Sequence, residues 1–321
     1  MFESDDHIFP TKPELVGQDR KSMFVKLGLS VLLFVGVFYS VIQENYIFIS
    51  EIVAILLLHE LGHYLTMRAY GHKSLNMTFI PFIGAMVSGK ASKISQKQRI
   101  NIALMGPLPG VIIGSVLFVM FLNGYQNDFI LEISMLLLVI NILNLTPLDP
   151  LDGGKIIEAL FFPKNDNVKM YFTLFSSLIV ICVGWYLDFF ILMIFGFFMA
   201  FKVRGFQKSQ RIYQDLEEIE FNYTRSYDGL SNKDYWTIRR VFLDNNPKIK
   251  DIIPSEMVLW ENEKLLVDQI KQLLKLEITL DLTFFQKTIY LLIYLASIVI
   301  PSYLIYSNWT MIVDFTGLSN V

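Results

Sequence analysis

The stretch Ile52–Arg68, IVAILLLHELGHYLTMR, joins a hydrophobic run of membrane-span character to a motif of metal ligands. His59 and His63 are four positions apart, so on a helix both imidazoles lie on one face, where they can bind the same zinc ion. Glu60 lies beside them and is suited to act as a general base. Because a charged group at the bilayer centre costs about 2.5–3.5 kcal/mol, polar groups placed there usually face a cavity and have a function. A chance motif with ordinary core histidines is the alternative.

The composition favours a membrane protein and excludes several other classes. Of the 321 residues, 53% are hydrophobic. They gather in blocks of about 15–20, the length that a helix needs to cross the hydrocarbon core. The net charge of −3 gives no indication of nucleic-acid binding. Cys182 is the single cysteine, which excludes an intramolecular disulfide and a zinc site built from cysteine pairs.

We predict an all-α polytopic membrane protein with about seven transmembrane helices. The predicted spans are residues 23–41, 48–68, 100–122, 129–146, 168–186, 189–203 and 288–306. Residues 1–22 form a cytosolic lead-in, and the membrane domain covers residues 23–203. The charged segment 204–286 forms a small cytosolic helical domain, followed in 287–321 by a final transmembrane helix and a tail. Helical patterns in the charged segment lie near 209–222, 232–243 and 256–277.

The distribution of Lys and Arg predicts a cytosolic N-terminus. With that orientation, four segments lie outside the membrane, at residues 42–47, 123–128, 187–188 and 307–321. None of them contains a Lys or an Arg, so all 27 basic residues fall on the inside or at inner helix ends. Cytoplasmic loops carry an excess of these residues, which supports this topology and places the segment 204–286 in the cytosol.

The segment between the second and third predicted spans is apolar but does not have a helical pattern. Gly71, Pro81, Gly84 and Gly89 interrupt any helix there. We predict a short β-hairpin at residues 76–88 that dips into the membrane, where protein or a cavity must satisfy its backbone. An ordinary surface loop is the alternative.

Two distant motifs are expected at one membrane face. The spans 48–68 and 129–146 both run from the outside to the inside in the predicted topology. His63 lies about five residues from the inner end of its span, and the segment Asn144–Asp152 follows the inner end of the other. We therefore expect the two segments to meet close to the cytosolic surface.

A catalytic zinc usually has three protein ligands and leaves a fourth position open. We predict Asp152 as the third ligand, because Gly153–Gly154 suggests a turn that directs its carboxylate back into the bundle. Asp149 is expected to be a turn residue or to contact a ligand. His72 is expected on the solvated surface, and His7 lies in the lead-in.

These motifs resemble those of the site-2 protease family, the intramembrane zinc metalloproteases. The resemblance rests on HELGH at 59–63 and on Asn144-x-x-Pro147-x-x-x-x-Asp152-Gly153 at the end of a later span. Gly106-Pro107, in the span between them, is similar to the family's Gly-Pro segment. Gly110 departs from the family, which often has an asparagine a few residues after that pair. The resemblance covers about residues 48–155 and implies a three-helix metalloprotease core.

The resemblance implies a set of roles for the motif residues. Zinc ligands would be His59, His63 and Asp152, holding one Zn²⁺, and Glu60 would be the general base. We expect four residues to bind substrate, namely Asn144, Pro147, Gly106 and Pro107. Asn144 donates a hydrogen bond to the substrate or to a developing oxyanion, or else it caps the end of its span.

The expected substrates are transmembrane proteins that are cut within the bilayer, in regulated intramembrane proteolysis. We expect a bacterial cytoplasmic membrane, no nucleic-acid partner, and a partner or gating role for the domain 204–286. The alternatives are a catalytically silent family member and a metal-binding or transport membrane protein. A transporter would spread ionisable groups along several spans, whereas here they gather at one depth, apart from Glu132 and Asp188.

Overall fold

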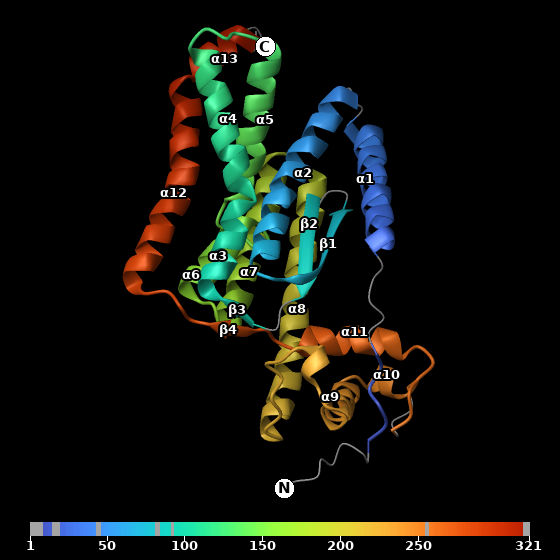
Figure 1. Cartoon of the computed structure of the whole chain (residues 1–321). Coiled ribbons are helices and arrows are strands. Elements are labelled where there is room, and N and C mark those ends of the chain that lie inside the picture. The colour runs from blue at the N-terminus through green and yellow to red at the C-terminus, as the bar shows by residue number, and fades with distance from the viewer. Residues whose placement is uncertain are drawn as a thin grey trace. The chain divides into compact units, whose positions relative to one another are not determined.

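The computed structural model describes residues 9–14, 20–42, 46–80, 84–90, 93–253 and 257–316, and helices dominate it (Figure 1). The described residues fall into two compact units. One unit combines the described residues of Met1–Gln18 and Ala91–Ile94 with Asp166–Thr279. The other takes its described residues from Asp19–Lys90, Ser95–Asn165 and Leu280–Val321.

The unit that contains the HELGH motif is built mainly from helices. Its helices are α1 (Arg20–Ile42), α2 (Tyr46–Ala69), α3 (Gln96–Met105), α4 (Pro107–Leu122), α5 (Asp128–Asn144), α6 (Asp152–Phe161), α12 (Phe284–Ser307) and α13 (Trp309–Thr316). Its strands β1 (Lys73–Ile80) and β2 (Gly84–Lys90) pair antiparallel, with Asn76 opposite Ser88. The predicted hairpin is therefore confirmed, although its turn at 81–83 lies outside the described residues. Its insertion into a membrane stays a prediction.

The other unit contains two long helices and a small helical domain. Its elements are α7 (Asp166–Tyr186), α8 (Phe190–Glu218), η2 (Tyr227–Gly229), α9 (Asn232–Asp244), α10 (Pro247–Lys250), α11 (Glu263–Leu273) and β4 (Glu277–Thr279). Strand β3 (Lys93–Ser95), which begins in this unit, pairs with β4 in a two-stranded sheet that the sequence did not predict. The hydrophobic core of the small domain includes Leu216, Ile238, Phe242, Leu266 and Ile270, all buried.

Among the described residues, five helices are long and apolar enough to cross a membrane. They are Tyr46–Ala69, Gln96–Leu122, Asp166–Tyr186, Phe190–Glu218 and Phe284–Ser307. Each overlaps one of the predicted spans. The remaining predictions, 23–41 and 129–146, overlap α1, which has a shorter apolar stretch at Leu27–Val37, and the 17-residue α5. A mostly helical membrane protein is thus supported, while the count of seven spans stays a prediction.

The helix of the predicted sixth span, residues 189–203, continues beyond residue 203. Helix α8 runs without interruption to Glu218 and includes most of the separate helical pattern predicted at 209–222. The connecting residues 204–208, RGFQK, contain no proline, and a single glycine does not end a helix. A change from apolar to charged composition therefore marks a change of surroundings along one helix, not its end.

Helix α2 packs directly against the junction of α3 and α4. A methyl group at Gly62 would lie 1.9 Å from the carbonyl oxygen of Met105, so only glycine fits there. Pro107 is the first residue of α4 and suits that position because its missing N–H needs no partner. Helices α3 and α4 meet at this Gly-Pro pair, which brings backbone of α3 against the HELGH face of α2.

Candidate metal centre

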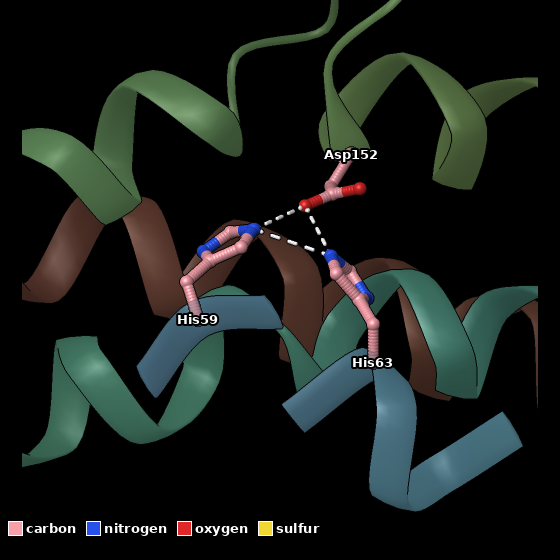
Figure 2. Close-up of side chains that lie close together, drawn as sticks. All are labelled: His59, His63 and Asp152. Carbon is pink, nitrogen blue, oxygen red and sulfur yellow. Dashed lines mark hydrogen bonds and ion pairs between the residues drawn. The ribbon is translucent and has the colours of Figure 1, made fainter. Parts of the chain in front are cut away.

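Three buried side chains meet at one point (Figure 2). His59 and His63 project from α2, and Asp152 is the first residue of α6. The Nε2 atoms of the histidines lie 2.9 and 3.0 Å from Oδ2 of Asp152 and 3.2 Å from each other. Their exposed fractions are 4%, 7% and 2%. Among the described residues, this is the one group of three or more His, Cys, Asp or Glu side chains that could hold a metal ion.

The second nitrogen of each imidazole is held by an acceptor. Nδ1 of His63 donates to the backbone carbonyl of Ile102 at 2.7 Å. Nδ1 of His59 lies 2.8 Å from Oδ1 of Asn141, whose Nδ2 donates to the carbonyl of Leu137 at 2.7 Å. That second bond fixes the orientation of the Asn141 amide, so its oxygen accepts from the imidazole. Both rings therefore carry their proton on Nδ1 in the neutral form.

This tautomer leaves three acceptor atoms facing one another. Nε2 of each neutral imidazole presents a lone pair, and the Asp152 carboxylate oxygen presents negative charge. With no donor between them, such a buried arrangement is repulsive, and a bound cation removes the repulsion. The donor set, two imidazole nitrogens and a carboxylate oxygen, is one that Zn²⁺ prefers. Bonds of about 2.0–2.2 Å to a tetrahedral zinc separate ligand atoms by about 3.3–3.6 Å, so this cluster needs to open by only a few tenths of an ångström.

Asp152 is positioned by the end of α5 and by Lys155. Its other oxygen, Oδ1, accepts a hydrogen bond from Nζ of Lys155 at 2.9 Å. Tyr294 of α12 donates to the carbonyl of Leu145, just after α5, at 2.7 Å. This contact anchors the segment that leads into α6, so the carboxylate is held from both sides of the turn.

The expectation of a turn at Gly153–Gly154 was wrong. Both glycines belong to the first turn of α6, and the turn precedes Asp152. Their small size serves close packing instead, since a methyl group at Gly153 would lie 2.1 Å from the carbonyl oxygen of Leu145. The carboxylate thus reaches the histidines where α6 packs tightly against the end of α5.

Glu60 is buried next to the cluster and is 5% exposed. Its Oε2 atom has no hydrogen-bond partner among the described residues. A buried carboxylate oxygen without a partner is costly. Oε2 of Glu51 on the same helix also has no partner among the described residues, so the place of Glu60 beside the metal-ligand cluster is what distinguishes it. The arrangement is suited to a group that receives a proton from a ligand in the site.

The other predicted site residues divide into two sets. Gly106 lies against the cluster, because a methyl group there would be 2.3 Å from Nε2 of His63, and Pro107 is buried beside it. Asn144 donates to the carbonyl of Ile140 at 3.0 Å, and Pro147 is exposed in the turn after α5. Neither Asn144 nor Pro147 is among the described residues that form the cluster.

The remaining alternatives for the third ligand also lie outside it. Asp149 does not belong to the metal-ligand group found among the described residues. His72 follows α2 and is half-buried, which differs from the expected solvated position, and burial lowers the pKa of its imidazole. His7 is outside the described residues.

Sequence reasoning missed Asn141. An amide inside the apolar run LLLVINILN must find a partner, and this signal was available from the sequence. Its place depends on Gly110 of α4, where a methyl group would lie 2.1 Å from Nδ2 of Asn141. The departure noted at Gly110 therefore has a structural consequence, because the space next to this glycine is filled by an amide from α5.

The described apolar helices and the buried cluster are consistent with a membrane protein that has a metal-binding centre. Residues 47–135 match the model of peptidase family M50. The chain is 31% identical over 156 residues to the zinc metalloprotease MJ0392 of Methanocaldococcus jannaschii. The resemblance found in the motifs is thus confirmed for this segment, which is similar to peptidase family M50 and to a zinc metalloprotease.

The similarity does not extend over the whole of these proteins. The match to the zinc metalloprotease covers 45% of this chain and 44% of the relative, so the chain spans less than half of that protein's length. A solved structure, the site-2 protease from Methanocaldococcus jannaschii, is similar at 25% identity over 56% of this chain and 88% of that one, with a TM-score of 0.43.

Proposed function

We propose that this chain is an intramembrane zinc metalloprotease that hydrolyses peptide bonds in or near transmembrane segments of membrane proteins. The observation that carries the proposal is the buried meeting of three acceptor atoms from His59, His63 and Asp152, which suits a cation. The family match of residues 47–135 and the apolar helices support the same activity.

In this proposal His59, His63 and Asp152 hold one Zn²⁺. The ion, when bound, polarises the scissile carbonyl and lowers the pKa of a coordinated water. Glu60 accepts a proton at its unpartnered Oε2 and passes it to the leaving amine. Asn141 and the carbonyl of Ile102 keep both imidazoles in the tautomer that presents Nε2 to the metal.

The substrate must reach this site in an extended form, because helical hydrogen bonding shields its peptide bonds. The sheet of β1 and β2 has two strands, so an extended substrate can pair with an edge strand. We propose Asn144, Pro147, Gly106 and Pro107 as the residues that bind substrate. Asn144 keeps its alternative role at the helix end, which its bond to Ile140 supports.

The proposal extends to the arrangement of the chain in the membrane. It comprises seven spans around a core at residues 48–155, with the N-terminus in the cytosol and a bacterial cytoplasmic membrane as the location. Residues 1–22 form the lead-in, 23–203 the protease domain, 204–286 the cytosolic helical domain, and 287–321 the last helix and tail. The absence of Lys and Arg from all four predicted outside segments supports this orientation.

The test compares Glu60→Gln with the wild type in liposomes that contain a reporter transmembrane segment. Glu60→Gln removes the base and keeps the ligands, so we expect about one zinc per chain and a cleavage rate lower by about 10²–10⁴. Glu51→Gln, the same change on the same helix, is the matched control and should keep the wild-type rate. Unchanged cleavage in Glu60→Gln, or a wild type that retains no zinc, would refute the proposal.

A further inference from the structure

The N-terminal segment Phe9–Pro13 binds the small helical domain through its own backbone. This segment and the domain belong to the same compact unit. Nε1 of Trp236 donates to the carbonyl of Pro10 at 2.7 Å, and the hydroxyl of Tyr227 donates to the carbonyl of Pro13 at 3.0 Å. Phe9 packs against the hydrophobic core of the domain. Two aromatic side chains thus donate hydrogen bonds to the peptide carbonyls of an extended segment.

Lys12 lies between these two contacts and is held by backbone carbonyls. Its Nζ donates to Tyr227 O at 3.1 Å, to Asp228 O at 3.2 Å and to the carbonyl of Leu230. Three carbonyls match the three donors of an ammonium group. The backbone N–H of Lys12 donates to Oδ1 of Asn232 at 2.9 Å, and its Nζ lies 5.4 Å from the centre of the Tyr227 ring. A neutral side chain would leave these carbonyls without their shared cation.

The chemistry of this contact is that of peptide recognition. The prolines at positions 10 and 13 fix their φ angles, so the extended segment loses little conformational freedom when it binds. Protein domains commonly recognise extended proline-rich segments with aromatic side chains. On the domain side, Trp236 and Tyr227 are 5% and 6% exposed with the segment in place. They belong to the buried core of the domain, so the donors are held rigidly.

We propose that the face formed by η2, Asn232 and Trp236 is a binding site for extended peptides of the type Pro-x-Lys-Pro, occupied in this chain by residues 10–13. Because residues 10–13 are part of the same chain, their effective concentration at this face is of the order of millimolar. A free peptide therefore binds the face only after residues 10–13 have dissociated from it. The carbonyls of η2 select lysine, and the aromatic donors select an extended backbone. This inference does not depend on the metal centre.

The test uses the full-length chain in nanodiscs and a fluorescent synthetic peptide with the sequence of residues 6–16. In one variant, residues 9–13 are replaced by glycine and serine at equal length. We expect saturable binding of the peptide to this variant and at least tenfold weaker binding to the wild type. A peptide with methionine in place of the lysine should bind the variant at least tenfold more weakly. Lys264→Met, at an exposed position of α11, is the control substitution. Introduced into the glycine–serine variant, it should leave the affinity for the lysine peptide unchanged.

A second measurement examines the segment in its own chain. Hydrogen exchange at the backbone amide of Lys12 should be slow in the wild type and faster in Asn232→Ala, which removes its acceptor. Equal exchange in both chains would overturn the proposed contact. Failure of the peptide to bind the variant, equal binding to variant and wild type, or equal binding of the lysine and methionine peptides would overturn the binding site.

Discussion

In the described part of the chain, each unit contains a buried cluster of ionisable side chains, and the two clusters differ in how their polar atoms are paired. In the helical domain, Arg239 donates to both oxygens of Glu263, from Nε at 2.7 Å and from Nη2 at 3.3 Å. The hydroxyl of Tyr235 and the backbone N–H of Trp260 also donate to Glu263. In the metal centre, by contrast, His59, His63 and Asp152 turn acceptors toward one another.

The comparison shows that burial of charge does not by itself mark a functional site. Arg239 and Glu263 are 1% and 6% exposed, as deeply buried as the metal-centre residues. Their donors and acceptors alternate, so the protein satisfies them without a ligand. With both histidines neutral, the metal centre has an excess of acceptors, which suits a bound cation. The balance of hydrogen-bond donors and acceptors, rather than burial, distinguishes the structural cluster from the candidate metal site.

The largest effect should come from breaking the satisfied cluster. Arg239→Met leaves the Glu263 carboxylate buried without its cation and should lower the free energy of unfolding of the helical domain by about 3–5 kcal/mol. Hydrogen exchange of the α9 and α11 amides in the full-length chain measures this loss. The double variant Arg239→Met/Glu263→Met should recover most of it. A single variant with wild-type exchange would show that the pair contributes little.

A smaller effect, confined to zinc, should follow the loss of a metal ligand. Structural zinc sites have four protein ligands and bind zinc with about 10–16 kcal/mol, which is roughly 3 kcal/mol for each ligand. His63→Ala should therefore lower zinc affinity by about 100–1,000-fold, as measured by competition with a chelator. Exchange in α9 and α11 should stay at the wild-type level. Unchanged zinc affinity would exclude His63 as a ligand.

The contact between Asn141 and His59 should have an effect smaller again. Residues that orient a metal-binding histidine typically change affinity by about 10–100-fold. We expect this loss of zinc affinity in Asn141→Leu, together with a shifted visible spectrum of the Co²⁺-substituted protein. Asn144→Leu, on the same helix, should leave both readouts unchanged because its amide bonds to the Ile140 carbonyl. Equal effects of the two variants would mean that Asn141 acts only through packing of α5.

The smallest effect is expected at an exposed ion pair of the helical domain. Nζ of Lys250 lies 2.7 Å from Oδ1 of Asp244, but the two side chains are 45% and 50% exposed. Solvent screens such pairs, so Lys250→Ala should cost less than about 1 kcal/mol. Hydrogen exchange of the α9 amides measures this change in the free energy of unfolding. If Lys250→Ala lowered the free energy of unfolding as much as Arg239→Met does, exposed and buried ion pairs would contribute equally to the stability of this domain.

The sequence alone determined the features that depend on local spacing. The spacing of four residues from His59 to His63 places both rings on one helix face whatever the rest of the chain does. Apolar runs of sufficient length predicted the five helices that the structure confirms as candidate spans. Gly71, Pro81, Gly84 and Gly89 argued against a helix between these positions, and a strand pair is found there.

Asp152 was predicted to lie near these rings, but only the tertiary structure decided which other distant groups meet them. Asn141 lies 82 residues from His59 in sequence, and Ile102 lies 39 residues from His63. Both contacts require close approach of helices, which the small residues Gly62 and Gly110 permit. The continuity of α8 and the packing of α6 that directs Asp152 were likewise not visible in the pattern. A repeat of 3.6 residues is a property of one helix, whereas the contacts between helices depend on the shapes of both.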